Sequence, residues 1–421
     1  MVTSAAVLHP TAFTLTELDR ALRSGVPALH AAAVPGAQFV VPAAHLDGFD
    51  LRSWAQTHCD SPQGRTRLQR VAARATLPVR TACCVALSAC TAARLTSAEA
   101  RDTTVLIAGN NLALGNQSRA AAAYAADPSA SRAGHLLDCF DTDALGAVGE
   151  VTGCGGEGWP IGGSSAASAL ALIHATRMVA TGQASRCLVV APANDLSPVE
   201  TSAFVKAGAM AQITEGRSPA EACRPFDTSH NGFAAAHIAA AVLIEHPSQA
   251  HRRGIRPLGR ILGSATTTDG RRGTQPDTAG QIRAMRAALS NSGLAPADID
   301  YVNAHGTGAA LGDDSEAAAL AAVFSTADRP LGDGPWINST KALLGHGLGA
   351  AGLIETIATL LQLAGGYCHA NPHLTDPVRP DLRFAHRSLT RTPLHTALSN
   401  SFAFSGINAS LVLGRVEEDN G

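Results

Sequence analysis

The chain has 421 residues, 46% of them hydrophobic, and its formal net charge at pH 7 is −2. This composition is enough for an extensive core, and a near-neutral charge without basic runs argues against binding to nucleic acid or to anionic membranes. The apolar runs at residues 234–244 and 353–364 are shorter than the roughly 20 residues that span a bilayer, and no secretory pattern opens the chain, so we expect a cytoplasmic protein.

Apolar strand-like runs alternate with alanine-rich helical stretches along the chain. The clearest predicted strands cover residues 104–108, 187–191, 241–244, 301–304 and 409–413, and the clearest predicted helices cover 166–180 and 350–364. Buried strands between helices are typical of a layered α/β architecture. Glycines follow both helices, and the pattern indicates two similar halves, 1–250 and 251–421, that divide near residues 247–258. No sequence repeat proves this division.

A glycine-rich segment precedes the first of these helices. Ile161-Gly162-Gly163-Ser164 leads to Ser165, whose hydroxyl would lie near the unpaired N–H groups and the positive dipole of the helix start. The dipole contributes at most about 2 kcal/mol, so it cannot ionise an alcohol as it would a thiol. Ser165 could therefore attack a thioester only with a general base. The alternative is that Ser165 caps the helix, the commonest task of a serine there.

Three short motifs follow in the last third of the chain. His305-Gly306-Thr307-Gly308 places an imidazole directly after a predicted strand, where it could face a cavity. Lys341 stands four residues before Gly345-His346, and only two of the 32 basic residues are lysines, which favours a requirement for a compact ammonium at this position. Asn400-Ser401-Phe402-Ala403-Phe404-Ser405-Gly406 combines two phenylalanines with small residues.

Together these motifs resemble the signatures of the β-ketoacyl synthases, the condensing enzymes of fatty acid and polyketide assembly. The resemblance covers roughly residues 100–415 and implies a thiolase fold, in which two βαβαβ-type halves form five layers. It places Ser165 at the acyl-accepting position, where the family has a cysteine. It also implies that His305 and His346 hydrogen-bond the thioester carbonyl of a malonyl unit as its carboxylate leaves, which stabilises the enolate oxygen. Either imidazole is a candidate base for Ser165.

The resemblance assigns Lys341 an orienting role. Its ammonium would hold a neighbouring carboxylate, Glu316 or Glu355, and would bias the histidines electrostatically. The alternative for Lys341 is a surface position at a helix start. The glycines of this motif are interpreted as close-approach positions between helix and sheet, namely Gly345, Gly349 and Gly352.

The resemblance also predicts a gated acyl pocket. Thr307 and Phe402 would line it, and Phe404 would act as the gate; the alternative for the two phenylalanines is a place in the core. Ala403 and Ser405 stand where the family has glycines, so we expect no access to positive φ angles and a stiffer loop.

Several features depart from the family pattern. The family has Gly-Glu-Gly where this chain has Ala236-His237-Ile238, which favours an altered function. Cys83 and Cys154 lie in segments that superficially match the nucleophile region, but their positions along the chain do not fit, and Cys83 is expected in the core of a helix. The nine cysteines show no metal-ligand spacing, so we expect reduced thiols and no metal site.

Three functions are open at this point. The first, which we expect, is an acyltransferase of a type II polyketide or fatty acid pathway, in which Ser165 accepts an acyl group from acyl carrier protein (ACP) or coenzyme A as an oxyester. The second is decarboxylation of malonyl-ACP by the histidines, which generates a primer. The third is a non-catalytic partner subunit that shapes the chain-length pocket, and the presence of His305, Lys341 and His346 argues against it.

The resemblance further implies the partners. ACP would deliver its substrate on a phosphopantetheine arm, and no permanently bound cofactor is expected. The chain would form a homodimer, or a heterodimer with a ketosynthase-like subunit.

Overall fold

The first half of the chain is built around a five-stranded sheet in the order β1-β8-β6-β4-β5. The computed structural model describes residues 1–325, 330–386 and 388–416. Strand β1 runs antiparallel to β8, β8 antiparallel to β6, and β4 pairs in parallel with both β6 and β5. The strands of this sheet are β1 (Val2–Leu8), β4 (Thr104–Ala108), β5 (Gly158–Ile161), β6 (Arg186–Ala191) and β8 (Ala239–Glu245).

The second half repeats this sheet with the same topology, in the order β9-β15-β14-β10-β11. Strand β9 is antiparallel to β15, β15 is antiparallel to β14, and β10 pairs in parallel with β14 and β11, so each strand has a counterpart in the first sheet. The chain crosses between the sheets through α11 (Pro247–Arg252), and the division proposed at residue 250 falls inside that helix. The strands are β9 (Arg260–Thr268), β10 (Tyr301–Asn303), β11 (Trp336–Asn338), β14 (Thr396–Ala403) and β15 (Ile407–Gly414).

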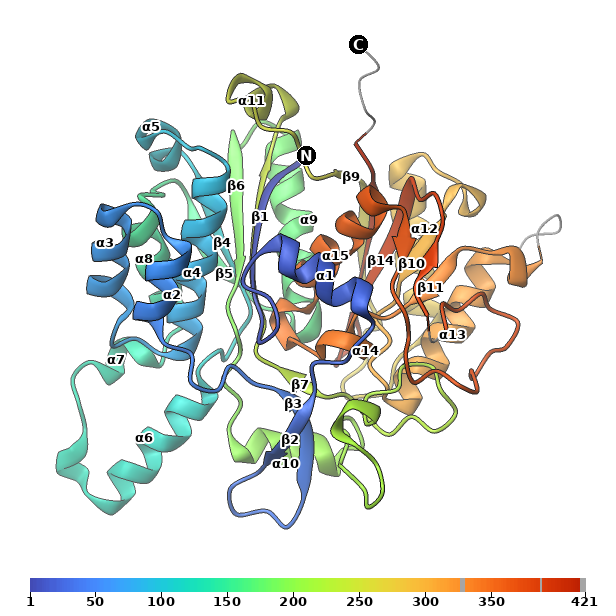
Figure 1. Ribbon diagram of the computed structural model, residues 1–421, viewed down its shortest axis with the longest axis horizontal. Coiled ribbons are helices and arrows are strands. Elements are labelled where there is room, and N and C mark those ends of the chain that lie inside the picture. Colours follow the sequence, from blue (N-terminus) through green and yellow to red (C-terminus); the bar gives the residue numbers. More distant parts are fainter. Residues whose placement is uncertain (326–329, 387, 417–421) are drawn as a thin grey trace.

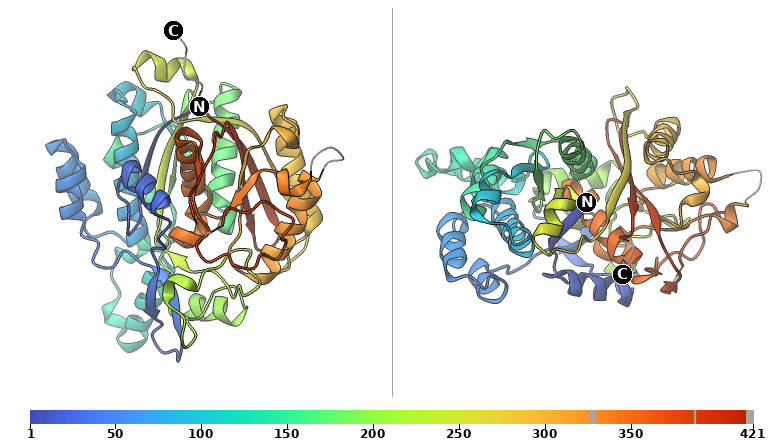
Figure 2. Two further views of the ribbon diagram at one scale, coloured as in Figure 1. Left: turned by 45° about the vertical axis from the view of Figure 1, so that its right-hand side comes forward. Right: turned by 90° about the horizontal axis from the view of Figure 1, so that it is seen from above.

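The helices complete five layers, which are seen most clearly in Figure 1 and from above in Figure 2. Two helices pack on each other between the sheets, and two further helices cover the outer face of each sheet. The central pair is α9 (Ala167–Ala180) and α15 (Ala351–Gly365), and the outer pairs are α4 (Leu77–Ala92) with α8 (Thr142–Thr152), and α12 (Thr278–Ser292) with α13 (Ala310–Phe324). Two similar halves in five α/β layers match the predicted architecture.

Smaller elements surround this body. A three-stranded sheet in the order β2-β3-β7 lies at one end of the molecule, and β12 pairs with β13. The short strands are β2 (His30–Ala33), β3 (Val40–Ala44), β7 (Ala235–Ala236), β12 (Tyr367–Cys368) and β13 (Thr390–Arg391). The remaining α-helices are α1 (Leu15–Ser24), α2 (Leu51–His58), α3 (Pro62–Ala72), α5 (Ser97–Arg101), α6 (Leu114–Ala126), α7 (His135–Asp138), α10 (Pro198–Lys206) and α14 (Lys341–Leu344).

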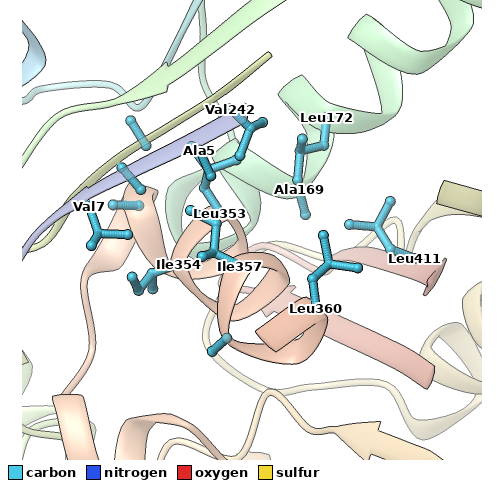
Figure 3. Packing of buried hydrophobic residues seen from close by; sticks show 14 of the residues in the cluster. Ala5, Val7, Ala169, Leu172, Val242, Leu353, Ile354, Ile357, Leu360 and Leu411 are labelled. Atoms are coloured by element: carbon cyan, nitrogen blue, oxygen red, sulfur yellow. The ribbon is translucent and has the colours of Figure 1, made fainter. Parts of the chain in front are cut away.

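The core lies around the central helix pair (Figure 3). Helices α9 and α15 each pack against a sheet and against one another. They are therefore apolar around most of their circumference, as expected for fully buried helices. Leu353, Ile357 and Leu360 of α15 are at most 3% exposed. One described helical window, Leu348–Gly365, is long and apolar enough to cross a membrane, but 78% of it is buried inside the protein, so it is a core helix.

Gly352 sets the spacing of the two central helices. A Cβ atom at this position would lie 2.9 Å from the backbone nitrogen of Ala169 and 2.9 Å from the Oγ of Ser401. We expect Gly352→Ala to lower the free energy of unfolding by about 1–3 kcal/mol, because a packed backbone must shift. Denaturant unfolding measures this, with Gly146→Ala as the control: Gly146 is an exposed position of α8 with open space around its Cβ, so this change is expected to stabilise by about 0.5–1 kcal/mol. Equal effects would contradict the interpretation.

Candidate active site

Ser165 lies in a single 3₁₀ turn, Ser164–Ala166, that leads into α9. Gly163 and Ser164 both have positive φ angles, 153° and 51°, so the turn holds Ser165 on a tight bend at the helix entrance. The Oγ atom of Ser165 is 3.0 Å from Nε2 of His346. The predicted helix-cap alternative is wrong, because the cap residue of α9 is Ala166 and no side-chain cap bond forms there.

His346 lies just before the corresponding turn of the second half. It precedes the 3₁₀ turn Leu348–Ala350, which leads into α15, and Leu348 has the same φ of 51° as Ser164. The backbone of His346 is fixed by β7, because its N–H donates to the carbonyl of Ala234 at 2.7 Å and its carbonyl accepts from the N–H of Ala236 at 3.0 Å. The two halves thus bring Ser165 and His346 together through corresponding turns.

A backbone hydrogen bond selects the tautomer of His346. The N–H of Leu348 donates to Nδ1 of His346 at 3.2 Å, so Nδ1 carries no proton. In the neutral ring the proton is then on Nε2, which donates to the Oγ of Ser165. In this arrangement His346 is a hydrogen-bond donor toward the cavity and not a base for Ser165.

Both histidines of the site are neutral at pH 7. Burial lowers the pKa of His346 well below its usual range, and the positive charge of Lys341 lowers it further. Burial likewise lowers the pKa of His305, with further contributions from Lys341 and His346. The two rings are nearly perpendicular, at 82°, with centroids 5.6 Å apart. The site therefore presents neutral imidazoles from two different segments.

Glu316 holds the backbone of the His305 turn. Its carboxylate accepts from the N–H groups of His305 and Gly306, at 2.9 and 2.8 Å, and from the side-chain amide of Asn400 at 3.1 Å. Burial raises the pKa of Glu316 to about 7, although these hydrogen bonds oppose the shift. Asp313 acts in the same way one turn earlier in α13, where its carboxylate accepts from several backbone N–H groups, including that of Thr307 at 2.9 Å.

Lys341 is fully buried, so the surface alternative for it is wrong. It is 1% exposed, pairs with the equally buried Glu355, and donates to the carbonyl oxygen of His305 at 2.6 Å. Of the two carboxylates predicted as its partner, Glu355 is confirmed, and Glu316 instead holds the His305 backbone. Burial raises the pKa of Glu355 to about 7, while Lys341 acts to lower it.

A cavity of about 310 Å³ connects Ser165, His305 and His346 to the solvent. Its lining includes the site residues Ser165, Thr307, His346 and His305 together with Phe402 and Phe404. Phe402 is 6% exposed and its ring lies 6.0 Å from that of His305, whereas Phe404 is 38% exposed at the rim. The core alternative thus describes Phe402, which is buried in the cavity wall, but not Phe404.

The loop after β14 corrects one prediction. Ser405 adopts a φ of 64°, so replacing a glycine by serine has not removed the left-handed conformation here. The N–H of Ser405 donates to the carbonyl of Gly273 at 2.8 Å, and Gly406 follows with a φ of 75°. The loop keeps its turn at the expense of backbone strain.

Residues outside the motifs also shape the cavity. The ring of Phe233 packs nearly perpendicular to that of His346, with centroids 5.1 Å apart, and Phe204 lies beside Phe233. Neither phenylalanine was predicted from the sequence: Phe233 lies just before the departure at Ala236-His237-Ile238, and nothing in the sequence marked Phe204. Cys83 is buried in α4, where burial raises its thiol pKa to about 12, and Cys154 lies 3.9 Å from the sulfur of Cys90; neither lines the cavity.

This fold and this constellation agree with the comparisons to known proteins. Residues 2–250 match the family model of the beta-ketoacyl synthase N-terminal domain, and residues 258–375 match that of the beta-ketoacyl synthase C-terminal domain. The chain therefore belongs to the β-ketoacyl synthase family, whose members are acyltransferase-type condensing enzymes.

Among curated relatives, the polyketide biosynthesis malonyl-ACP decarboxylase PksF of Bacillus subtilis is 35% identical over 286 residues, which is 68% of this chain and 67% of that protein. The mitochondrial 3-oxoacyl-(acyl-carrier-protein) synthase of Arabidopsis thaliana is 34% identical over 58% of this chain and 53% of that protein. The matches thus span from about half to two thirds of the relatives' length.

Solved structures confirm the thiolase fold. A β-ketoacyl synthase from Burkholderia phymatum has a TM-score of 0.80 at 25% identity, covering 99% of both chains. The ishigamide ketosynthase/chain length factor has a TM-score of 0.83 at 22% identity, covering 99% of this chain and 98% of the other. A type II acyl carrier protein–ketosynthase complex bound to a hexaketide gives 0.85 at 22% identity, with the same coverage.

Proposed function

We propose that this protein decarboxylates malonyl-ACP in a type II polyketide or fatty acid pathway. The observation that carries the proposal is the tautomer of His346: its Nε2–H points at the Ser165 oxygen, in the cavity that His305 also lines. Two neutral imidazoles can hydrogen-bond a thioester oxygen, whereas neither is arranged to take a proton from Ser165. The name of the Bacillus relative describes this reaction.

The reaction needs stabilisation of one developing negative charge. The bond between the malonyl carboxylate and Cα breaks, carbon dioxide leaves, and the electron pair moves to the thioester oxygen as an enolate. Hydrogen bonds from His305 and His346 to that oxygen strengthen as the charge grows, so they lower the barrier. Protonation of Cα by water then gives acetyl-ACP. Before substrate binds, the Ser165 hydroxyl occupies the His346 donor.

Lys341 contributes through its surroundings. Burial is the main reason that both imidazoles are neutral, and the charge of Lys341 lowers their pKa further, while Glu355 balances that charge inside the core. A neutral ring lets Nδ1 of His346 accept from the N–H of Leu348 while its Nε2–H remains a donor toward the enolate oxygen.

The acyltransferase function that the sequence led us to expect requires Ser165 to lose its proton. The only imidazole within hydrogen-bond distance of its oxygen among the described residues is His346, whose Nε2 carries a proton in the tautomer set by Leu348. Ser165 is therefore proposed to accept a hydrogen bond and not an acyl group. ACP, with its phosphopantetheine arm, and a dimeric assembly remain part of the proposal.

Ser165→Ala distinguishes the two functions. We expect the variant to convert malonyl-ACP to acetyl-ACP within about fivefold of the wild-type rate, because no covalent step is lost, with Ser164→Ala as the neighbouring control. Mass spectrometry of the wild-type peptide containing Ser165, after incubation with acyl-ACP, should show no acyl adduct. An adduct on Ser165, together with a loss of more than about 100-fold in the variant, would establish the acyltransferase instead.

A further inference from the structure

The small sheet β2-β3-β7 lies at one end of the molecule (Figure 1), and three imidazoles come together on it. His30 begins β2 and is paired in register with Ala43 of β3, and His45 follows directly after β3. His237 follows β7, which runs parallel to β3 in the register that places these two histidines side by side. Their rings stack with centroids 4.5 Å apart, at 23°. This is the position where the chain departs from the Gly-Glu-Gly expected of its family.

Asp47 adds a carboxylate to this cluster. Its Oδ2 lies 3.5 Å from Nε2 of His30, and the possible ligand atoms of His30, His45 and Asp47 all lie within 4.8 Å of one another. Zinc holds nitrogen and oxygen ligands at about 2.0–2.2 Å, which places them about 3.3 Å apart. A contraction of about 1.5 Å would complete the site, and the exposed side chains of His30 (42%) and Asp47 (79%) can rotate to make it.

The possible ligand atoms of His30, His45 and Asp47 are not used in hydrogen bonds to other described residues. Within the described parts of the chain, the structure gives the ring nitrogens of His30 and His45 no hydrogen bond, and Asp47 no charged partner except His30. The cluster borders an open cavity of about 530 Å³ lined by His45 and Asp47, so an ion can enter from solvent and keep water as a further ligand.

His237 supports this cluster from below. Its Nδ1 accepts from the N–H of Leu46 at 3.1 Å, which fixes the ring under His45. A ring fixed in this way limits the rotation of His45.

We propose that His30, His45 and Asp47 form a binding site for a divalent transition-metal ion, zinc in particular, with His237 as a positioning residue. Two imidazoles and one carboxylate favour zinc, nickel or copper over magnesium and calcium, which prefer oxygen ligands. The ion would cross-link β2 to the end of β3. Strand β3 pairs with β7, whose backbone is hydrogen-bonded to His346. The proposal differs from the sequence-based expectation of no metal site, because the ligands come from separate segments without a recognisable spacing.

The test uses untagged, full-length protein freed of metal by a chelator. Calorimetric titration with zinc chloride is expected to show one ion bound per chain, and titration with Co²⁺ should give the visible absorption of a low-symmetry site. His45→Ala and His30→Ala should each weaken zinc binding at least about 100-fold, and His237→Phe, which keeps a stacked ring, less than about 10-fold. Zinc should raise the midpoint of thermal unfolding of the wild type but not of His45→Ala.

Two controls keep the result interpretable. His58→Gln alters a histidine that lines the same cavity outside the cluster, and it should leave zinc affinity unchanged. Cys139→Ser removes a partly exposed thiol and should also leave it unchanged. Absence of zinc binding, or equal binding by the wild type and His30→Ala/His45→Ala, would overturn the proposal. Loss of binding in Cys139→Ser would assign the ion to the thiol and overturn it as well. Circular dichroism of each variant checks that it has folded.

Discussion

His346→Ala is expected to slow decarboxylation of malonyl-ACP by a factor of about 10²–10³, the largest effect on activity that we predict. The substitution removes the Nε2–H donor that points into the cavity, and removal of one preorganised donor to an oxyanion costs about 2.7–4 kcal/mol of transition-state stabilisation. Because the hydrogen bond strengthens mainly as the enolate forms, the loss should appear in kcat more than in KM. Release of acetyl-ACP, followed by mass spectrometry under single-turnover conditions, measures it.

The matched variant is His305→Ala, for which we expect a loss of the same order. If both rings bind the same oxygen, each single variant also weakens the hydrogen bond of the ring that it keeps. The fold-loss of rate in the double variant should therefore be smaller than the product of the two single losses. His251→Ala, in exposed helix α11, serves as the control and should leave the rate unchanged. An undiminished rate in His346→Ala would rule out the proposed role of this ring.

Lys341→Met is expected to produce the largest loss of stability, about 3–5 kcal/mol at pH 8, because it leaves Glu355 buried without its partner. The loss should depend on pH. Removing the ammonium raises the pKa of Glu355 above its present value of about 7, so the folded variant binds a proton that the unfolded chain, with a carboxyl pKa near 4.5, has released. The stability of the variant should therefore fall as pH rises from 6 to 8.

Denaturant unfolding at pH 6 and pH 8 measures this prediction. In Lys341→Met/Glu355→Leu no charge is buried, so most of the stability should return and the extra dependence on pH should disappear. The double variant thus separates the cost of an unpaired carboxyl from a loss of packing. A loss in Lys341→Met that is equal at both pH values and is not relieved by the second substitution would contradict the interpretation.

Much of the fold was predictable because the strands that form the centre of each sheet are almost wholly buried and appear as apolar runs in the sequence. The predicted strand 104–108 coincides with β4, and the other predicted strands and helices end within one or two residues of the observed ones. Strand β1 was missed because alanine, serine and threonine make up most of it, although all seven of its residues are buried. Alanine and serine have little strand preference of their own, and pairing with β8 is what makes this segment a strand.

The candidate site was predictable where a motif carries it. The motifs predicted that Ser165, His305, Lys341 and His346 lie in one region and that Glu355 is a candidate partner of Lys341, and the structure has these contacts. It did not provide the tautomer of His346, which depends on one backbone N–H, nor the positive φ of Ser405, which the hairpin imposes. The histidine cluster around His45 was invisible for a similar reason, because strand register alone brings its members together.

The two 3₁₀ turns that lead into α9 and α15 have one more implication. Ser164–Ala166 and Leu348–Ala350 have matching backbones in matching places, so Gly349 is the counterpart of Ser165. A Cβ atom on Gly349 would lie 3.1 Å from the Cα of Gly109, which leaves little room for any side chain there. An internally duplicated chain would in principle offer two equivalent reaction centres, one in each repeat. Here steric exclusion in one repeat confines the chemistry to a single pocket, to which both repeats contribute.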